Sequence, residues 1–163
     1  MALTKLNLAS GVTGTLSTSN YTDNGKILQA VHYRKDADVS KSSDGVVHAN
    51  INITPSSSSS KILVIISATI EGAGGTGDYA FIYLRRNISS SITTTVQIAN
   101  ALGYQATGGK RHTISCNSLD EPNTTSQVTY ELYHDESAGG ATYQYYETNY
   151  TLLEIGAWLI LVL

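Results

Sequence analysis

A cysteine and a histidine four residues apart are the side chains best suited to nucleophilic chemistry. Cys116 is the single cysteine of the chain, and His112 precedes it in a segment of strand character. Every second side chain of a β-strand lies on the same face, so the two would share a face. A thiol beside an imidazole is a nucleophile with its base. A buried cysteine that only fills space is the more frequent case, so we expect no catalytic residue and no enzyme.

Two short segments carry residue types that bind metal ions. One is His134–Glu136 (HDE), and the other consists of His32, Asp36 and Asp38. Neither has the spacing of paired ligands in a zinc site, and neither follows the pattern of a calcium-binding loop. Each is therefore predicted to be a solvated turn without a bound metal.

A glycine-rich segment, Gly72–Gly77 (GAGGTG), has the spacing of a dinucleotide-binding loop. Such a loop must open a helix, because the helix N-terminus binds the pyrophosphate. The residues that follow, Asp78–Leu84, alternate in the manner of a strand instead. The segment is predicted to be a β-turn, and no cofactor is expected.

Tyrosines are the most prominent candidates for contact with a ligand or a second subunit. The chain contains 11 Tyr against one Phe and one Trp. A flat apolar face with a polar tip suits sugars and protein interfaces, whereas aromatic pairing within a sheet is the alternative. The candidates near the C-terminus are Tyr143, Tyr145, Tyr146 and Tyr150. Because Tyr145 and Tyr146 are adjacent, they face opposite sides of a strand, and at least one of them should be exposed or at an interface.

The composition favours strands over helices. Charged residues make up 14% of the 163 residues, whereas the chain contains 19 Ser and 19 Thr. Hydroxyl-bearing residues suit pleated sheets and turns, and solvent-exposed helices prefer Ala, Glu, Lys and Gln. The formal net charge is −3, so no basic stripe for nucleic acid is expected.

Short apolar or alternating segments separated by turn residues predict about eight or nine strands. The segment Lys61–Ile70 (KILVIISATI) is continuously apolar and is predicted to be a central strand buried on both faces. The other predicted strands are Ile27–Arg34, Val47–Ile53, Tyr79–Leu84, Thr94–Ile98, His112–Leu119, Gln127–His134, Thr142–Glu147 and Tyr150–Ile155. The fold class is therefore predicted to be all-β, an antiparallel, jelly-roll-like β-sandwich.

The two ends of the chain differ from the rest. Residues 1–25 are predicted to form an extended N-terminal arm, residues 26–156 the sandwich domain, and residues 157–163 an apolar strand or interface segment. The tail is too short to span a bilayer, which takes about 20 helical residues, so no membrane insertion is expected. Its apolar side chains must be buried, either in the same sandwich or in a seam between subunits. The predicted assembly residues are Leu3, Leu6, Leu8, Trp158, Leu159, Ile160, Leu161, Val162 and Leu163.

An ordered set of short motifs carries a resemblance to a known family. The motifs are Lys26–Val31 (KILQAV), Ile53–Ser56 (ITPS), Ser60–Val64 (SKILV), Leu84–Arg86 (LRR), Leu119–Thr125 (LDEPNTT), Val128–Tyr130 (VTY) and Thr151–Ile155 (TLLEI). Their order resembles a β-sandwich module common in virion structural proteins of tailed bacteriophages, and the resemblance covers roughly residues 26–156. Read physically, Asp120 and Asn123 can bond nearby backbone, Pro122 fixes a turn, and Glu154 is expected to bond a neighbouring backbone or an arginine.

The resemblance implies a structural role on the virion surface, on the capsid exterior or the tail. A chain of this length has no room for a fibre shaft, which favours a capsid decoration (cement) or knob module. The expected partners are other copies in a homotrimer, the major capsid protein, or tail and baseplate proteins. The alternative is a receptor-binding tail-fibre tip that contacts a host surface glycan or protein.

Overall fold

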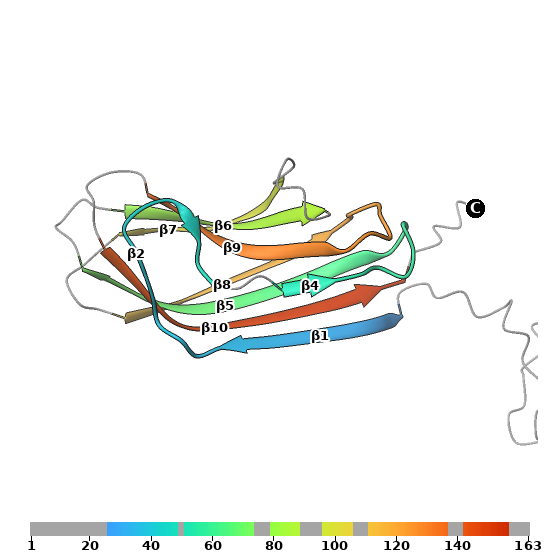
Figure 1. The fold of residues 1–163 in the computed structure, drawn as a ribbon, viewed down its shortest axis with the longest axis horizontal. Coiled ribbons are helices and arrows are strands. Elements are labelled where there is room, and N and C mark those ends of the chain that lie inside the picture. Colours follow the sequence, from blue (N-terminus) through green and yellow to red (C-terminus); the bar gives the residue numbers. More distant parts are fainter. Residues whose placement is uncertain are drawn as a thin grey trace, which may run out of the picture.

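The computed structural model of the chain describes residues 26–48, 51–73, 79–88, 96–105, 111–136 and 142–156. Within these ranges the chain forms ten β-strands and no helix (Figure 1). The strands are β1 (Ile27–Lys35), β2 (Val39–Lys41), β3 (Gly45–Val46), β4 (Ile51–Ile53), β5 (Lys61–Ala73), β6 (Tyr79–Ile88), β7 (Val96–Gln105), β8 (Arg111–Asp120), β9 (Val128–Glu136) and β10 (Thr142–Ile155).

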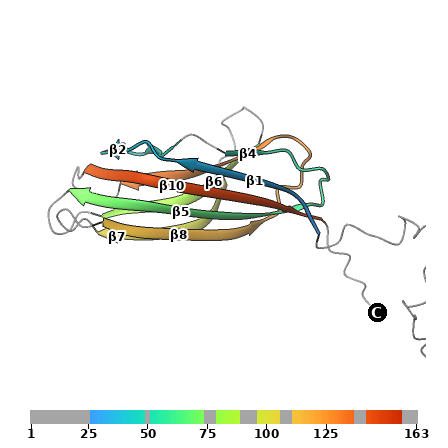
Figure 2. The same cartoon turned by 90° about the horizontal axis from the view of Figure 1, so that it is seen from below.

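The strands form two antiparallel sheets that face each other. Sheet A has the order β1-β10-β5-β8, and β2 also pairs with β10 (Figure 2). Sheet B has the order β3-β9-β6-β7, and β4 also pairs with β9. β1 pairs with residues 148–155 of β10 and β2 with residues 143–145, while β5 lies along the other side of β10. β1 and β2 are therefore two parts of one strand position, and so are β3 and β4 along β9.

Merging these two pairs leaves eight strand positions. Numbered along the chain, sheet A has the order 1-8-3-6 and sheet B the order 2-7-4-5. This is the strand order of a jelly roll, in which two Greek keys wrap into a double sheet. The prediction of an antiparallel, jelly-roll-like β-sandwich is confirmed.

The core lies between the sheets and consists of aliphatic and tyrosine side chains. β10 shows how the sequence produces it, because its side chains alternate between the core and the outside. The register against β5 shifts between Tyr145 and Thr148, which is a bulge. Tyr145 and Thr148 therefore both point inward, while Tyr146 and Glu147 point outward. The two strands predicted at Thr142–Glu147 and Tyr150–Ile155 are one strand, since the bulge bends it without ending it.

β5 was predicted to be buried on both faces, but only one of its faces is covered. It is central in sheet A, but each sheet of a two-layer sandwich has only one covered face. Its inward side chains are Ile62, Val64, Ile66, Ala68 and Ile70, all of them buried. Leu63 is partly exposed, and Ile65 is 39% exposed on the outer face.

Both ends of the described sandwich lie together. The backbone N–H of Gly156 donates to the carbonyl of Lys26 at 2.9 Å. The chain therefore enters and leaves the sandwich at the same end (Figures 1 and 2). The predicted arm, residues 1–25, and the predicted tail, residues 157–163, lie outside the described residues, so the predicted domain limits and assembly residues stay predictions.

Candidate functional site

The cysteine and the histidine of β8 differ in exposure. Cys116 is buried, and burial raises the pKa of its thiol, which keeps it in the less nucleophilic form. His112 is the second residue of the strand, and its side chain is exposed. Cys116 belongs to the hydrophobic core cluster.

The histidine of the HDE segment is a core residue. His134 is fully buried, and its Nδ1 lies 2.7 Å from the hydroxyl of Tyr145. Burial lowers the pKa of His134, which favours the neutral ring. His32 contacts the hydroxyl of Thr151, and Asp36 accepts a bond from Arg34. Among the described residues, no group of three or more His, Cys, Asp or Glu is placed to hold a metal ion.

The glycine-rich segment joins two strands, β5 and β6, and most of it lies outside the described residues. The prediction that a strand follows it is confirmed by β6. Across the described part of the chain, no helix is long and apolar enough to cross a bilayer.

For three of the four candidate tyrosines, the prediction of contact with a ligand or a second subunit is wrong. Tyr143, Tyr145 and Tyr150 have no exposed surface, because they lie on the inward face of β10. From these positions they cannot contact a ligand or a second subunit, and the alternative of aromatic packing fits them. Tyr146 is on the opposite face, as the adjacency of Tyr145 and Tyr146 predicted.

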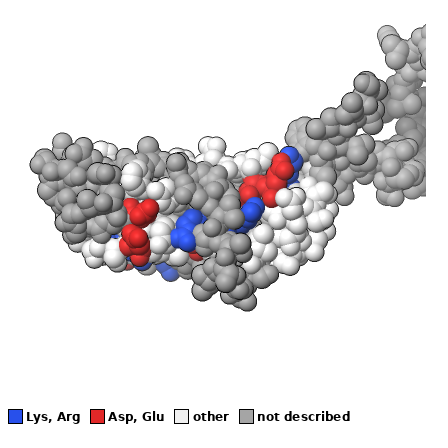
Figure 3. All heavy atoms as spheres, turned by 90° about the horizontal axis from the view of Figure 1, so that it is seen from above, with Lys and Arg blue, Asp and Glu red and all other residues white. Residues whose placement is uncertain are grey.

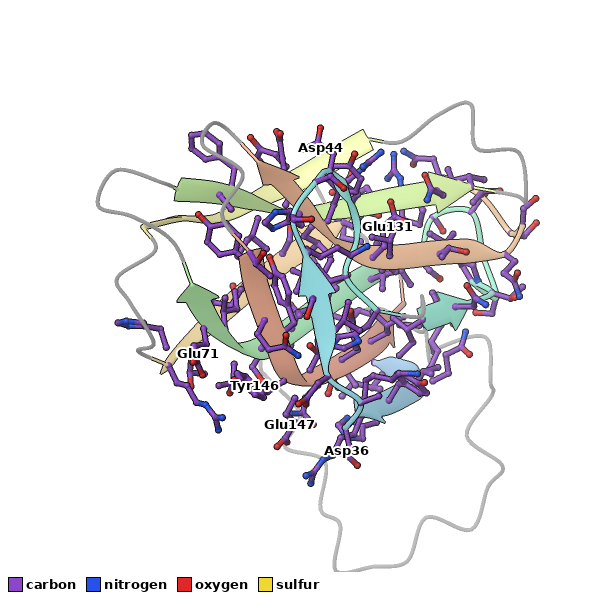
Figure 4. All side chains as sticks on the ribbon, turned by 60° about the vertical axis from the view of Figure 1, so that its left-hand side comes forward. Asp36, Asp44, Glu71, Glu131, Tyr146 and Glu147 are labelled. Carbon is purple, nitrogen blue, oxygen red and sulfur yellow. The ribbon has the colours of Figure 1, made fainter. Side chains whose placement is uncertain are left out.

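Tyr146 belongs to a polar end of the outer face of sheet A. Its hydroxyl donates to Glu71 at 2.6 Å, and the guanidinium of Arg111 lies 3.8 Å from the centre of its ring (Figure 4). Arg111 also donates to Glu71 at 2.9 Å. The hydrogen bond from Tyr146 and then that from Arg111 lower the pKa of Glu71. Three residues from three strands are thus held in one cluster in contact with solvent.

A shallow polar groove of about 220 Å³ lies on this face. It is lined by Ser67, Ala68, Thr69, Thr113, Glu147 and Asn149. Asn149 donates to Glu147 at 3.0 Å, and Arg34 lies 3.2 Å from the same carboxylate. Hydroxyl, amide and carboxylate groups at this spacing can bond a polar ligand such as a sugar.

The opposite end of the same face is apolar. Ala30, Leu153, Leu63 and Leu119 lie side by side across the four strands of sheet A, in direct register. All four point outward, because their neighbours along each strand point into the sandwich. The row is extended by Ile27 and Ile155 on one side and Ile65 on the other. We call these seven residues the apolar end. Leu119 is 51% exposed and Ile27 62% exposed.

Directly behind the leucines, three of the four inward side chains are polar. The inward row consists of Gln29, Glu154 and Asp120 together with the core residue Ile62, again in register across the sheet. Glu154 is fully buried and accepts bonds from Gln29 at 2.6 Å and from the backbone N–H of Ser56 at 2.7 Å. The hydroxyl of Ser56 donates to it as well, at 2.6 Å. The expectation that Glu154 bonds a neighbouring backbone is confirmed.

Asp120 joins the two sheets. It accepts a bond from Arg86 of β6 at 2.7 Å and one from the hydroxyl of Tyr130 of β9 at 2.6 Å. The Arg86 and Asp120 side chains are 14% and 7% exposed. Asp120 was predicted to bond nearby backbone, so this partnership is a correction; Asn123 does bond the carbonyl of Glu121, at 3.0 Å. At this end of sheet A, acids are therefore inside and leucines outside.

The apolar end was missed from the sequence because β5 was interpreted as buried on both faces. A signal was nevertheless present. Leu119-Asp120 and Leu153-Glu154 place a leucine next to an acid near the C-terminal ends of two strands. Continuing the inward alternation of Tyr150 and Leu152 puts Glu154 inside and Leu153 outside.

Among the described residues, charged side chains do not gather into one large patch on the face shown in Figure 3. Acidic and basic residues are scattered there among a wider area of other residue types. Within the described part of the chain this face offers no extended basic stripe of the kind that binds nucleic acid.

Comparisons with known proteins concern the fold. No protein-family model matches the chain, and no curated protein matches it. A chain in the structure of infectious bursal disease virus, Gt strain, is similar with a TM-score of 0.50 and 12% identity over 82% of this chain. A chain of the VP2 subviral particle of the same virus is similar with a TM-score of 0.47 and 16% identity over 80% of this chain. Eiger TNF from S. frugiperda is similar with a TM-score of 0.42 and 9% identity over 86% of this chain.

The chain spans only part of the viral chains, 39% of the Gt-strain chain and 34% of the VP2 chain. It spans 94% of the Eiger chain. At 12% identity, the similarity to the Gt-strain chain concerns the fold alone.

Proposed function

We propose that this chain is a structural protein of a bacteriophage particle, exposed on the virion surface as a decoration (cement) or knob module. It attaches to the major capsid protein or to tail and baseplate proteins through its arm and its tail. The observation that carries this proposal is the apolar end of sheet A, which lies where Lys26 and Gly156 meet. An exposed apolar patch of this kind marks a surface for contact with another protein chain, a further copy or a partner.

The fold supports a role in a particle. Jelly rolls build many viral capsid proteins. A chain of infectious bursal disease virus has this fold with a TM-score of 0.50. Because the two sequences are 12% identical, the likeness concerns the fold, and the virion role is our proposal.

The side chains with reactive chemistry support a structural role over a catalytic one. Cys116 is buried with a raised thiol pKa, and His134 bonds Tyr145 inside the core. Glu154 and Asp120 are used to hold a loop and the second sheet in position. Each of these groups has a stabilising partner or is enclosed by the core.

Localisation on purified particles tests the proposal. Particles are separated into heads and tails, and each fraction is probed with an antibody against the chain. We expect the chain to remain with heads after the tails are removed. Recovery with tails alone would reject the decoration role, and absence from both fractions would reject the virion role. For the proposed homotrimer, the solution mass should be about three times the 17.4 kDa of one chain.

The second candidate function is receptor binding by a tail-fibre tip, and the polar groove beside Tyr146 favours it. Hydroxyl and amide groups in the groove can hydrogen-bond a sugar, and Tyr146, next to the lining residue Glu147, adds a flat apolar face. An excess of pure protein should then compete with particles and lower infection. The variant Asn149→Ala, in the groove, should compete less well than Ser115→Ala, which lies outside it. Equal infection with and without added protein would reject this candidate.

A further inference from the structure

Both sides of the C-terminal segment are apolar. In an extended segment, Trp158, Ile160 and Val162 would lie on one side and Leu159, Leu161 and Leu163 on the other. A single sheet surface covers only one side of such a segment. Burial of both sides therefore requires surfaces from more than one copy of the chain, the sheet of one copy on one side and a further contact between copies on the other.

The segment starts beside a surface that it can cover. Ile155 is part of the apolar end, and residue 157 follows two residues later. Seven extended residues reach about 23 Å, at about 3.3 Å each. The row from Ala30 to Leu119 crosses four strands, which is about 14 Å at about 4.8 Å per strand. The segment is therefore long enough to lie across the whole row, its own or the identical row of a second copy.

The apolar end also has the anatomy of an interface. Its centre is the row of leucines, and polar groups surround it: the ion pair of Lys61 with Glu121 lies at one border, and His32 and Asn117 lie at the other. An apolar centre within a polar rim is typical of protein–protein interfaces.

We propose that the apolar end of sheet A is a self-association surface, on which residues 157–163 of a second copy pack across the row Ala30, Leu153, Leu63 and Leu119. Each copy gives its tail to one neighbour and receives a tail from another. Such a contact is heterologous, and it gives a trimer when the rotation between neighbouring copies closes after three. This inference rests on the proposed function for its setting on a particle, and it names the surface through which copies meet.

Introducing a charge into the apolar end tests whether the tail binds there. Leu119→Asp and Ile27→Asp place a charge among the apolar side chains at positions that are 51% and 62% exposed, so the sandwich itself should fold. In analytical ultracentrifugation of the full chain, each change should raise the dissociation constant of the oligomer on the order of tenfold or more. The matched control is Ser115→Asp, which is exposed on the same strand and the same face and should leave the oligomer unchanged. A monomeric wild-type chain, or an equal effect of Ser115→Asp, would overturn the inference.

Disulfide trapping tests whose tail occupies the row. In a Cys116→Ala background, a chain with Leu119→Cys is mixed with a longer, tagged chain with Leu161→Cys, and the mixture is oxidised with diamide. We expect a covalent product that contains one chain of each size. A second chain carries both substitutions. If it forms only an internal disulfide and the mixture forms no hetero-product, each tail covers its own sheet and the inference is wrong. If neither the hetero-product nor the internal disulfide forms, the inference is wrong as well.

The inference and the proposed function can fail separately. A chain that is found on particles but is monomeric in solution and insensitive to Leu119→Asp keeps the function and loses the inference. A chain that forms the trapped oligomer but is absent from particles does the reverse.

Discussion

The two ends of sheet A use the same strands in opposite ways. At the polar end, outward residues such as Tyr146, Arg111 and Glu71 bond one another in contact with water, and the side chains behind them are apolar or aromatic. At the apolar end, leucines point outward and Glu154 and Asp120 point inward. Bonds between exposed groups compete with water and contribute little, whereas the same groups in the interior are costly to leave unpaired. The comparison therefore predicts that stability depends on the acids of the apolar end far more than on those of the polar end.

The largest effect is expected from Asp120→Ala. The change leaves Arg86, which is 14% exposed, without its carboxylate, and it removes the acceptor of Tyr130. Breaking a buried ion pair on one side costs about 3–5 kcal/mol of unfolding free energy. Urea unfolding followed by circular dichroism measures it. The control is Glu71→Ala at the polar end, whose bonds with Tyr146 and Arg111 lie in contact with solvent, and it should lower stability far less. Equal losses for both variants would contradict the comparison.

A smaller loss is expected from Glu154→Ala. Three donors, from Gln29 and from the backbone and hydroxyl of Ser56, lose their acceptor. Leaving buried donors unpaired costs about 1–3 kcal/mol. Amide hydrogen exchange in residues 54–60 should also become faster, because Glu154 holds that loop. Stability within error of the wild type, with unchanged exchange in the loop, would show that the bonds of Glu154 contribute nothing.

His134, which bonds Tyr145 behind the polar end of sheet A, should make stability depend on pH near neutrality. Burial lowers the pKa of His134 below its ordinary 6.5, so the unfolded chain takes up a proton that the folded chain does not. The unfolding free energy should therefore fall as the pH drops below about 6.5. His48, whose pKa is also lowered by burial, acts in the same direction. Urea unfolding between pH 7 and 5 measures the slope, and His134→Gln should make it smaller.

Glu154 should act only in stronger acid. Its burial acts to raise its pKa, but the hydrogen bonds from Ser56 and Gln29 outweigh burial and lower it below 4.5. A carboxylate with a lowered pKa stabilises the fold above that range, and its contribution is lost as the pH falls through the folded value. Glu154→Gln should therefore flatten the loss of stability below about pH 4.5 and leave the slope between pH 7 and 5 unchanged. A change confined to the higher range would contradict the assignment.

The smallest effects are expected from two adjacent tyrosines. Tyr145→Phe removes the hydroxyl that bonds His134 inside the core and should cost about 1 kcal/mol. Tyr146→Phe removes a hydroxyl that bonds Glu71 at the surface, and no measurable change in stability is expected. Thermal unfolding of the two variants side by side checks the difference, and a larger loss for Tyr146→Phe would reverse it.

The fold could be predicted from the sequence further than the site could. Alternation within β1 and β10 and the turn residues between strands identified a jelly-roll-like sandwich, because a period of two is a local property. The register between strands is not local. Nothing along the chain says that Leu63 lies between Leu153 and Leu119, which are 90 and 56 residues away. The apolar row therefore exists only after the sheet is assembled.

The errors had a common physical cause. An apolar segment such as β5 was taken as buried on both faces, and a cluster of tyrosines was named as candidates for contact with a ligand or a second subunit. In a two-layer sandwich the direction of each side chain, and not its hydrophobicity, decides whether it is covered. Tyr143 and Tyr150 point between the sheets and are buried, whereas Ile65 points away from them and is exposed.

The hydrogen bond between Gly156 and Lys26 also has a mechanical consequence. β1 and β10 run antiparallel, and their paired ends are the two points at which the chain enters and leaves the sandwich. A force that pulled these points apart would load the ladder one bond at a time, from Ile27 onward, which is the weakest way to load a β-pair. A tether that grips both points side by side avoids this peeling. To withstand mechanical load, both tethers of this domain should therefore be fixed to the same support.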